Sequence, residues 1–255
     1  DDTDCDDAHG TAYPGGAETW YDGVDGDCDG SSDFDADSDS WDSEDYGGYD
    51  CDDYDASSYP GLYWYVPADF PTIQEAIDAA CHLDTIEVAA GTWVENIDYG
   101  SKELYVFGAD GSASTTLDGA YNGRPVVTLM YGGLDGFTIT NGLAYYGGGV
   151  YLNGANGVAM SGLVVEDNYA STYGGGIYLG SSTDIAIRES VVSSNESGNY
   201  GGGIALYYYS DSSNPALTIT DTTISSNVAD YGGGVSASYG SYGTLVLDGV
   251  VVSDN

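Results

Sequence analysis

The chain has very few basic residues. Lysine and arginine occur three times, as Lys102, Arg124 and Arg188, against 42 aspartates and glutamates, so the formal net charge is −39. A surface that binds nucleic acid needs clustered basic side chains to neutralise the phosphates, so the composition argues against such a partner. The same charge should repel anionic lipids and acidic polysaccharides.

Long apolar runs are also missing. No segment approaches the roughly 20 apolar residues that a helix needs to cross a bilayer, so we expect no membrane insertion. The sequence starts without methionine and without a signal-peptide pattern, from which we expect a processed or excised segment. The composition nevertheless favours folding over disorder, because 42% of the residues are hydrophobic and 25 are tyrosines.

Aliphatic residues are scarce in the first part of the chain. Residues 1–55 hold 21 of the 42 acidic residues, no basic residue and three of the four cysteines. A segment of this kind cannot build an apolar core, so either metal ions, disulfides or both stabilise it, or it is disordered. We divide the chain into an Asp/Cys-rich calcium-binding module (1–61), a linker with a helical cap (62–84) and a repeat domain (85–255).

Acidic residues alternate along residues 33–39. Alternate carboxylates of a tight loop direct oxygens at a common centre, and Ca²⁺ takes six to eight oxygens at about 2.3–2.6 Å. Counted from Asp33, acids occupy positions 1, 3, 5 and 7 and Glu44 occupies position 12, as in an EF-hand loop, with Ser38 replacing the usual glycine at position 6. Counting from Asp35 is equally consistent and puts Tyr46 at position 12.

We therefore predict Ca²⁺ as the cofactor and the carboxylates of the acidic module as its ligands. The candidates are Asp4, Asp6, Asp7, Glu18, Asp22, Asp25, Asp27, Asp29, Asp33, Asp35, Asp37, Asp39, Glu44, Asp50, Asp52, Asp53 and Asp55. The alternative is an acidic, solvated tail that binds Ca²⁺ weakly and without specificity.

One sequence motif occurs twice in this module. Asp4-Cys5-Asp6-Asp7 returns as Asp50-Cys51-Asp52-Asp53, and Tyr13-Pro14-Gly15 returns as Tyr59-Pro60-Gly61. The motif resembles the Asp/Cys-rich metal-binding repeats of secreted bacterial proteins, which are similar to thrombospondin type-three repeats. The resemblance covers residues 1–61, with one full unit over 4–30 and a second that breaks off after Gly61. It implies Ca²⁺ binding and not catalysis.

Four cysteines allow three disulfide pairings. A zinc site is disfavoured, because the sequence has neither a Cys-x-x-Cys motif nor a histidine pair. Our hypothesis is that Cys5 pairs with Cys28 inside the first unit, and that Cys51 pairs with Cys81 of the following domain. Disulfides imply an oxidising environment, so we expect a secreted or cell-surface location.

The remaining residues form a repeat array. Tyr-Gly-Gly-Gly-(Val/Ile) occurs at residues 146–150, 173–177, 200–204 and 231–235, with periods of 27, 27 and 31. Each unit holds three short alternating runs joined by Gly, Ser and Asn turns. This pattern predicts one coil of a parallel β-helix per unit, with coils stacked about 4.8 Å apart. A propeller fits less well, because a blade needs about 40 residues and four antiparallel strands.

Residues that recur in phase should form ladders along the β-helix. We expect an inward apolar row, a row of asparagine amides bonded to one another at a turn, and a row of tyrosines beside the glycines. The rows are Val150, Ile177, Ile204 and Val235; Asn141, Asn168, Asn195, Asn227 and Asn255; and Tyr146, Tyr173, Tyr200 and Tyr231. We assign all three to scaffolding, although Asn195-Glu196-Ser197 matches a glycosylation acceptor.

The start of the repeat domain predicts a short amphipathic helix, with Thr72 as N-cap, Glu75 three residues later, and apolar residues at helical spacing up to Ala80. Such a helix would cover the open strand edges of the first coil. The runs 85–88, 91–95 and 102–108 predict the first strands.

Two further resemblances concern this domain. Its opening resembles the cap and first turns of pectin-lyase-like right-handed β-helices. The later Gly-Gly-Gly-Ile and Val-x-x-Asn units resemble repeats of polymorphic outer-membrane and autotransporter passenger proteins. Together these likenesses cover roughly residues 64–255 and imply an all-β, right-handed parallel β-helix. They say little about function.

Catalytic groups are sparse in the array. Pectin-degrading β-helices need aspartates clustered with basic residues, whereas the three basic residues here are scattered, and neither His9 nor His82 recurs. An acid–base pair across coils is conceivable, although turn aspartates more often bond their own backbone. The candidates for such a pair are Asp118, Asp135, Asp167, Asp184 and Asp221. We expect the chain not to be an enzyme, with a hydrolase or lyase acting on a neutral glycan as the alternative.

The sequence thus predicts a secreted, calcium-binding structural or adhesive protein of the bacterial cell surface or extracellular matrix. Its tyrosine-rich face suits contacts with a surface protein or a neutral glycan. The last coil ends at Asn255 without a polar cap, and we therefore also expect head-to-tail assembly of copies into a filament.

Overall fold

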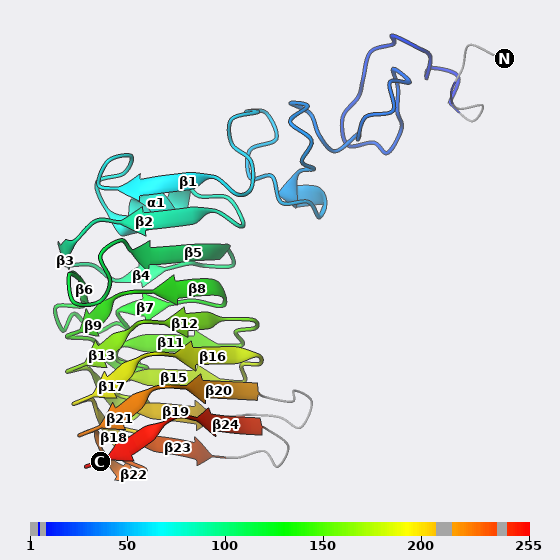
Figure 1. The fold of residues 1–255 in the computed structure, drawn as a ribbon. Helices are drawn as coiled ribbons and strands as arrows, with labels where there is room; N and C mark the ends of the chain where they lie inside the picture. Colours follow the sequence, from blue (N-terminus) through cyan, green and yellow to red (C-terminus); the bar gives the residue numbers. More distant parts are fainter. Residues whose placement is uncertain (1–4, 6–8, 208–215, 239–243) are drawn as a thin grey trace. The chain divides into compact units, whose positions relative to one another are not determined.

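The computed structural model describes residues 5, 9–207, 216–238 and 244–255. It contains two compact units: residues 1–62 with 81–84, and residues 63–80 with 85–255. We call the first unit the acidic module and the second the β-helix (Figure 1). The candidate ligands Asp4, Asp6 and Asp7 lie outside the described residues.

The β-helix begins with strand β1 (Tyr63–Val66), inside the segment that was expected to be linker, and the predicted cap helix follows it. Helix α1 (Ile73–Ala79) starts after Thr72, whose side-chain oxygen accepts a hydrogen bond from the Glu75 backbone N–H at 3.2 Å. Its apolar face is buried, with Ile73 and Ile77 at most 1% exposed. The Lys102 ammonium group donates to the carbonyl oxygens of Ile77 and Asp78, so it satisfies acceptors in the last turn of α1.

Parallel strands of successive coils stack into sheets, as the ribbon shows (Figure 1). Sheet 1 contains β1 (Tyr63–Val66), β2 (Thr85–Val88), β5 (Glu103–Gly108), β8 (Tyr131–Asp135), β12 (Ala159–Ser161), β16 (Ile185–Arg188), β20 (Ala216–Thr220) and β24 (Thr244–Asp248). Sheet 2 contains β4 (Ile97–Asp98), β7 (Val127–Thr128), β11 (Val150–Asn153), β15 (Ile177–Gly180), β19 (Ile204–Tyr207) and β23 (Val235–Ser238). Sheet 3 contains β3 (Gly91–Trp93), β6 (Thr115–Asp118), β9 (Thr138–Thr140), β13 (Val164–Glu166), β17 (Val191–Ser193), β21 (Thr223–Ser225) and β25 (Val251–Ser253). The predicted parallel β-helix is confirmed.

Later coils contain a strand that the sequence did not predict. Sheet 4 contains β10 (Leu143–Tyr146), β14 (Tyr169–Tyr173), β18 (Glu196–Tyr200) and β22 (Val228–Tyr231). The expectation was three strands per coil, and no strand was predicted for these segments. They are extended because each pairs in register with the same segment of the next coil, for example Tyr169 with Glu196.

The inward apolar row is confirmed by the register of sheet 2. Val150 pairs with Ile177, Ile177 with Ile204, and Ile204 with Val235. The first three of these side chains are fully buried. Because a single coil cannot bury its own apolar face, this stacking of equivalent side chains supplies the core of the β-helix.

The asparagine ladder is confirmed for part of the predicted series. The side-chain nitrogen of Asn168 donates to the side-chain oxygen of Asn195 at 3.0 Å, Asn195 donates to Asn227 at 3.0 Å, and Asn227 donates to Asn255 at 2.9 Å. Asn195 is 1% exposed, so the glycosylation-like motif around it is inaccessible in the fold.

The expectation that Asn141 belongs to this ladder is wrong. Strands β9 and β13 pair Thr138 with Val164, an offset of 26 residues rather than 27. The ladder position in that coil is therefore Gly142, whose backbone N–H donates to the Asn168 side-chain oxygen at 2.8 Å. Asn141 instead occupies the preceding turn position, where its φ is +59°.

The tyrosine row is confirmed in sheet 4. The rings of Tyr146 and Tyr173 stack with centroids 5.5 Å apart, followed by Tyr173 with Tyr200 at 5.3 Å and Tyr200 with Tyr231 at 4.9 Å. Offset stacking of this kind adds to the stability that burial of the rings supplies.

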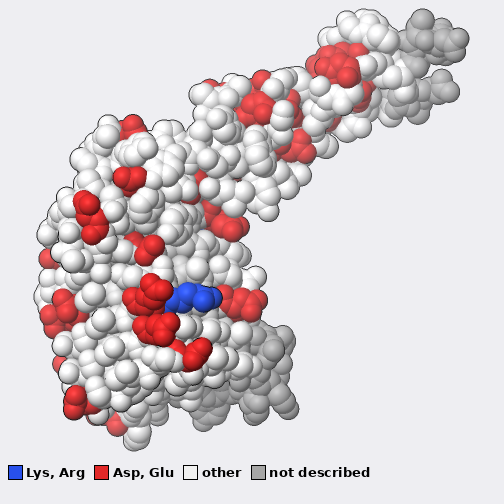
Figure 2. Space-filling model, in the orientation of Figure 1, with Lys and Arg blue, Asp and Glu red and all other residues white. Residues whose placement is uncertain are grey.

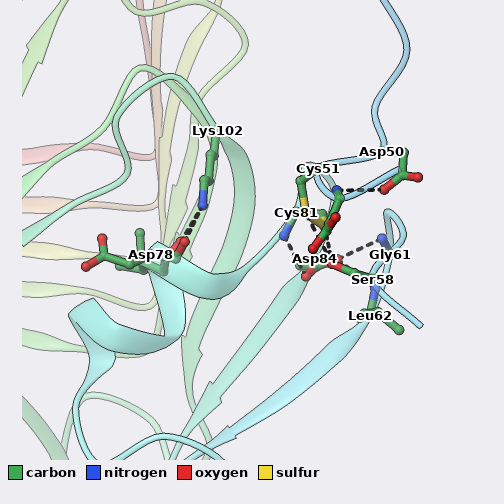
Figure 3. Close-up of a disulfide and its surroundings, with 11 residues drawn as sticks. Asp50, Cys51, Ser58, Gly61, Leu62, Asp78, Cys81, Asp84 and Lys102 are labelled. Carbon is green, nitrogen blue, oxygen red and sulfur yellow. Dashed lines mark hydrogen bonds between the residues drawn. A yellow bond between two sulfur atoms is a disulfide. The ribbon is translucent and has the colours of Figure 1, made fainter. Parts of the chain in front are cut away.

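The acidic module is held together without an apolar core. Among its described residues, regular structure is limited to the short helix η1 (Glu44–Tyr46) and a bridge between Ser43 and Asp50. Both hypothesised disulfides are confirmed: Cys5–Cys28, and Cys51–Cys81, of which Figure 3 shows the second. Since residues 81–84 belong to this unit, the second disulfide joins two parts of the acidic module.

Asp84 stabilises the part of the module around Cys81. Its carboxylate is fully buried and accepts hydrogen bonds from the backbone N–H groups of Gly61, Leu62 and Cys81 at 2.8, 2.7 and 3.0 Å (Figure 3). Several N–H donors on one carboxylate compensate the cost of burying it.

Candidate metal centre

The alternating aspartates of residues 33–39 form a tight loop. Asp35, Asp37 and Asp39 each bring a carboxylate oxygen within 4.8 Å of the others. The loop closes on itself because Asp35 accepts hydrogen bonds from the backbone N–H groups of Asp39 and Ser40. Ser38 and Ser40 adopt left-handed φ values of +63° and +82°, which turn the chain sharply enough to bring alternate side chains together.

The next segment adds two carboxylates to this loop. Ser43 donates its backbone N–H to the Phe34 carbonyl at 2.8 Å, and Ser43 and Asp50 form a bridge. The turn between them needs glycine at position 48, where a Cβ would lie 1.9 Å from the Asp42 carbonyl oxygen. As a result Asp50 and Asp53 each bring a carboxylate oxygen within 4.8 Å of one from Asp37.

Buried carboxylate oxygens in and near this loop have no hydrogen-bond donor. They are Asp33 Oδ1, Asp37 Oδ2, Asp39 Oδ2 and Asp50 Oδ2. Asp33 and Asp50 are 8% and 1% exposed. Leaving charged oxygens buried without a partner costs several kcal/mol each, whereas a cation in the clusters around Asp37 would give a partner to the oxygens of Asp37, Asp39 and Asp50. A donor set made of carboxylate oxygens suits a hard cation such as Ca²⁺.

The electrostatics of the centre agree with this geometry. The pKa of Asp50 is raised from 3.8 to about 6, chiefly by burial and also by the neighbouring charges of Asp39, Asp37 and Asp53, against the lowering effect of a hydrogen bond from the Asp52 backbone. Burial and the charge of Asp39 also raise the pKa of Asp37. A divalent cation would reverse these shifts, because it favours the ionised carboxylates.

We call Asp35, Asp37, Asp39, Asp50 and Asp53 the carboxylate centre. Asp33 lies outside the clusters found among the described residues, and one of its oxygens accepts a hydrogen bond from the Gly23 backbone N–H. Neither EF-hand numbering describes the centre fully. Glu44, position 12 when counted from Asp33, begins η1 and lies outside the clusters found among the described residues. Asp50 and Asp53, which follow the expected loop in the sequence, instead bring carboxylate oxygens near Asp37.

The other predicted ligands fall into two sets. Glu18, Asp25 and Asp27 bring carboxylate oxygens within 4.8 Å of one another, but Glu18 is occupied by hydrogen bonds from the backbone N–H groups of Gly26 and Asp27. The remaining predicted ligands lie outside the clusters found in the described part of the chain. These are Asp22, Asp29, Asp52 and Asp55.

A grouping of Asp50 with Cys51 and Cys81 also satisfies the distance requirement. Both cysteines are joined in a disulfide, so neither offers a thiolate, and this grouping does not suit a metal that prefers sulfur.

Tyr21 is a supporting residue that sequence reasoning missed. Its hydroxyl donates to Asp53 Oδ2 at 2.5 Å, and its ring stacks on Tyr46 with centroids 4.8 Å apart. The hydrogen bond fixes one oxygen of Asp53 at the edge of the carboxylate centre. Tyr21 lies 32 residues from Asp53, and no local pattern marks it.

The aspartates considered as catalytic are dispersed over the β-helix. Asp167, Asp184 and Asp221 occupy left-handed turn positions with φ between +47° and +54°, and Asp118 accepts a hydrogen bond from the Ala120 backbone. Asp135 lies on sheet 1, where its neighbours in register are Phe107 and Ser161. The register therefore places no second carboxylate directly beside Asp135 in the adjacent coils.

Family comparisons agree with the two units. Residues 106–255 match the family described as "Right handed beta helix region", and the chain belongs to this family. Residues 4–33 and 50–63 match a second family, described as "Putative metal-binding motif". Among curated proteins, none matches the chain. In the described residues, no helix is long and apolar enough to cross a membrane.

Similar solved structures include pectin methylesterases. The enzyme from carrot is 12% identical over 76% of this chain and 83% of its own, with a TM-score of 0.38. A pectin methylesterase from Aspergillus niger is 11% identical over 75% of this chain and 85% of its own, with a TM-score of 0.32. The expectation that the chain is not an enzyme is therefore corrected: its fold is shared with enzymes, and the exclusion of catalysis is withdrawn. At these identities the likeness concerns the fold and assigns no activity to this chain.

Proposed function

We propose that the acidic module binds Ca²⁺ at the carboxylate centre, and that the bound ion orders the module. The observation that carries this proposal is the set of buried carboxylate oxygens of Asp37, Asp39 and Asp50, which lie in the clusters around Asp37 and have no hydrogen-bond donor. Ca²⁺ is favoured over softer metals because the candidate ligands are oxygens and all four cysteines are in disulfides.

We further propose that the protein acts outside the cytoplasm as a structural or adhesive component. The two disulfides support an oxidising location. Extracellular fluid also supplies Ca²⁺ at the concentrations that extracellular modules of modest affinity require. In this proposal the ion keeps the acidic module folded, while the β-helix presents an extended surface to its partner.

Metal titration of the whole chain tests the first proposal. After chelation and buffer exchange, calorimetric titration with Ca²⁺ should give binding with a Kd on the order of 10⁻³ M or tighter. Hydrogen exchange over residues 33–53 should slow as the site fills, because an ion that binds the folded state stabilises it. Ordering by Zn²⁺ or Cu²⁺ but not by Ca²⁺ at ten millimolar would assign the site to another metal.

A polysaccharide-active β-helix is the second candidate function. The observation that favours it is an outward carboxylate, Asp135, bonded to an exposed tyrosine, Tyr105, on sheet 1. Incubation with neutral polysaccharides followed by measurement of new reducing ends tests this candidate. Asp135→Asn should abolish any such activity, and activity that survives this substitution would place the reaction elsewhere.

A further inference from the structure

An aromatic surface lies on the outward side of sheet 1, at its first coils. Parallel register aligns Tyr63 with Thr85 and Tyr105, and aligns Tyr65 with Glu87 and Phe107. Tyr63, Tyr65 and Tyr105 are 44%, 48% and 42% exposed. We call Tyr63, Tyr65, Tyr105 and Phe107 the aromatic platform.

The rings of the platform contact one another. Tyr63 and Tyr65 have centroids 4.9 Å apart, and Tyr105 stacks on Phe107 at 5.6 Å with an angle of 27° between the ring planes. Tyr63 also meets Phe107 edge-on at 6.3 Å. Large apolar rings that remain solvent-exposed while packing on one another form a contiguous apolar patch, which on a folded protein often marks a binding site.

Hydrogen bonds orient two of the platform tyrosines, Tyr63 and Tyr105. The Tyr105 hydroxyl donates to Asp135 Oδ2 at 3.0 Å, and the Tyr63 hydroxyl donates to a carboxylate oxygen of Glu87. The Tyr105 ring lies against Gly133 of the next coil, where a Cβ would come within 2.6 Å of the ring. Binding therefore costs little side-chain entropy, because the rings are already positioned.

The chemistry of the platform selects a class of ligand. An aromatic ring has a negative face, which attracts the weakly positive axial C–H groups of a pyranose whose hydroxyls are equatorial. Glu87 and Asp135 flank the rings and offer carboxylate oxygens that accept hydrogen bonds from sugar hydroxyls. The same carboxylates repel an acidic sugar, and Figure 2 shows acidic residues spread over the visible face with basic residues at one place.

We propose that the aromatic platform binds a neutral glycan whose pyranose hydroxyls are equatorial, with its rings stacked on Tyr63 and Tyr105 and its hydroxyls donating to Glu87 and Asp135. This binding is independent of metal, because the platform belongs to the β-helix and the carboxylate centre belongs to the acidic module. It names a ligand for the β-helix whether or not the bound glycan is cleaved.

Calorimetric titration of the whole chain with β-1,4-linked glucohexaose and xylohexaose, in the presence of chelator, tests the proposal. At least one neutral hexaose should bind, and hexagalacturonate should not. Tyr105→Ala should weaken binding about tenfold, the scale of one lost stacking contact, and Tyr63→Ala combined with Tyr105→Ala should abolish it. The matched control is Tyr121→Ala, which removes a tyrosine that is 53% exposed outside the strands of sheet 1.

Three results would overturn the proposal: no binding of either neutral hexaose, equal binding of hexagalacturonate, or unchanged affinity in the double variant with an unchanged thermal transition of the β-helix. Glycan binding in chelator together with no Ca²⁺ binding would remove the metal proposal and leave this one standing. Ca²⁺ binding without glycan binding would overturn the glycan proposal and leave the metal proposal standing.

Discussion

Asp37 and Asp50 lie thirteen residues apart in the sequence, yet a carboxylate oxygen of each lies within 4.8 Å of the other and of one from Asp53. Both residues also carry a buried oxygen without a hydrogen-bond donor. Their proximity joins the alternating loop to the segment before Cys51. A cation at this point would hold together two stretches of chain that repel each other electrostatically in its absence.

Replacing Asp50 should therefore weaken metal binding more than replacing an exposed carboxylate. Asp50→Asn removes one charge and one oxygen ligand from a buried position, and we expect a loss in Ca²⁺ affinity of at least about tenfold, equivalent to 1.4 kcal/mol. Asp55→Asn is the control, because Asp55 is exposed and bonds Ser57. Calorimetric titration of both variants measures the difference. Equal affinities would show that the ion lies elsewhere.

Acidification should stabilise the acidic module when metal is absent. The folded-state pKa of Asp50, about 6, is above its ordinary value of 3.8. The fold thus favours protonated Asp50, a contribution that is complete below about pH 4 and is lost as the pH rises through 6. In chelator, hydrogen exchange over residues 33–53, corrected for its intrinsic pH dependence, should therefore be slower at pH 5 than at pH 7.

Two comparisons isolate Asp50 in this experiment. The pH effect should shrink in Asp50→Asn. It should persist in Asp55→Asn, because hydrogen bonds from Ser57 lower the pKa of Asp55, so protonation of Asp55 does not favour the folded state. Ca²⁺ should oppose the trend, since its binding requires ionised carboxylates. A metal-free module whose protection is the same at both pH values would contradict the buried position of Asp50.

The disulfide between Cys51 and Cys81 spans 30 residues. Closing a loop of this length in the unfolded chain is worth about 3–4 kcal/mol in the chain-entropy model. The double variant Cys51→Ser, Cys81→Ser should therefore increase hydrogen exchange at residues 49–62, while sheets 2 and 3 keep their protection. Cys5→Ser with Cys28→Ser is the comparison, and it should affect residues 9–30 instead. Equal loosening of both segments by both variants would contradict local stabilisation.

The asparagine ladder gives a stability prediction for the β-helix. Asn195 donates to Val165 and Asn227, and its side-chain oxygen accepts from the backbone and the amide of Asn168. Asn195→Ala leaves several of these groups buried without a partner, at about 1–3 kcal/mol each. We expect a total loss of about 3–5 kcal/mol in urea denaturation. Asn153→Ala, at an exposed position, should change stability by less than about 0.5 kcal/mol.

The sequence was informative about the β-helix because coils repeat. In-phase apolar, asparagine and tyrosine residues report which side chains stack, and the structure contains all three rows. The error at Asn141 arose because the sequence was aligned on the tyrosine motifs, where Tyr146 pairs with Tyr173 at an offset of 27 residues. The offset is 26 up to Ala144, and the register shift after Ala144 is visible only in the strand pairing. The strands of sheet 4 were missed for a related reason, since segments such as 196–200 have few apolar residues and gain their pairing from the neighbouring coils.

The carboxylate centre was only partly accessible to the same reasoning. Alternation of aspartates is a local signal, so the proximity of Asp35, Asp37 and Asp39 could be expected. The contribution of Asp50 depends on the contact between Ser43 and Phe34, and the support of Asp53 depends on Tyr21. Such contacts join residues that share no spacing rule, so they appear only once the chain is folded.

Ser38 provides a last test, because it occupies the position where an EF-hand loop usually has glycine. Its φ of +63° is left-handed, a conformation that costs a residue with a Cβ about 1–2 kcal/mol. Ser38→Gly removes this cost but adds roughly 0.5–1 kcal/mol of backbone entropy to the unfolded chain. The net effect should be about 0.5–1 kcal/mol in favour of the folded loop, measured as slower hydrogen exchange over residues 33–53 and slightly tighter Ca²⁺ binding. Ser38→Ala keeps the strain and should bring no gain, whereas equal behaviour of the two variants would mean that the left-handed turn does not limit the stability of the loop.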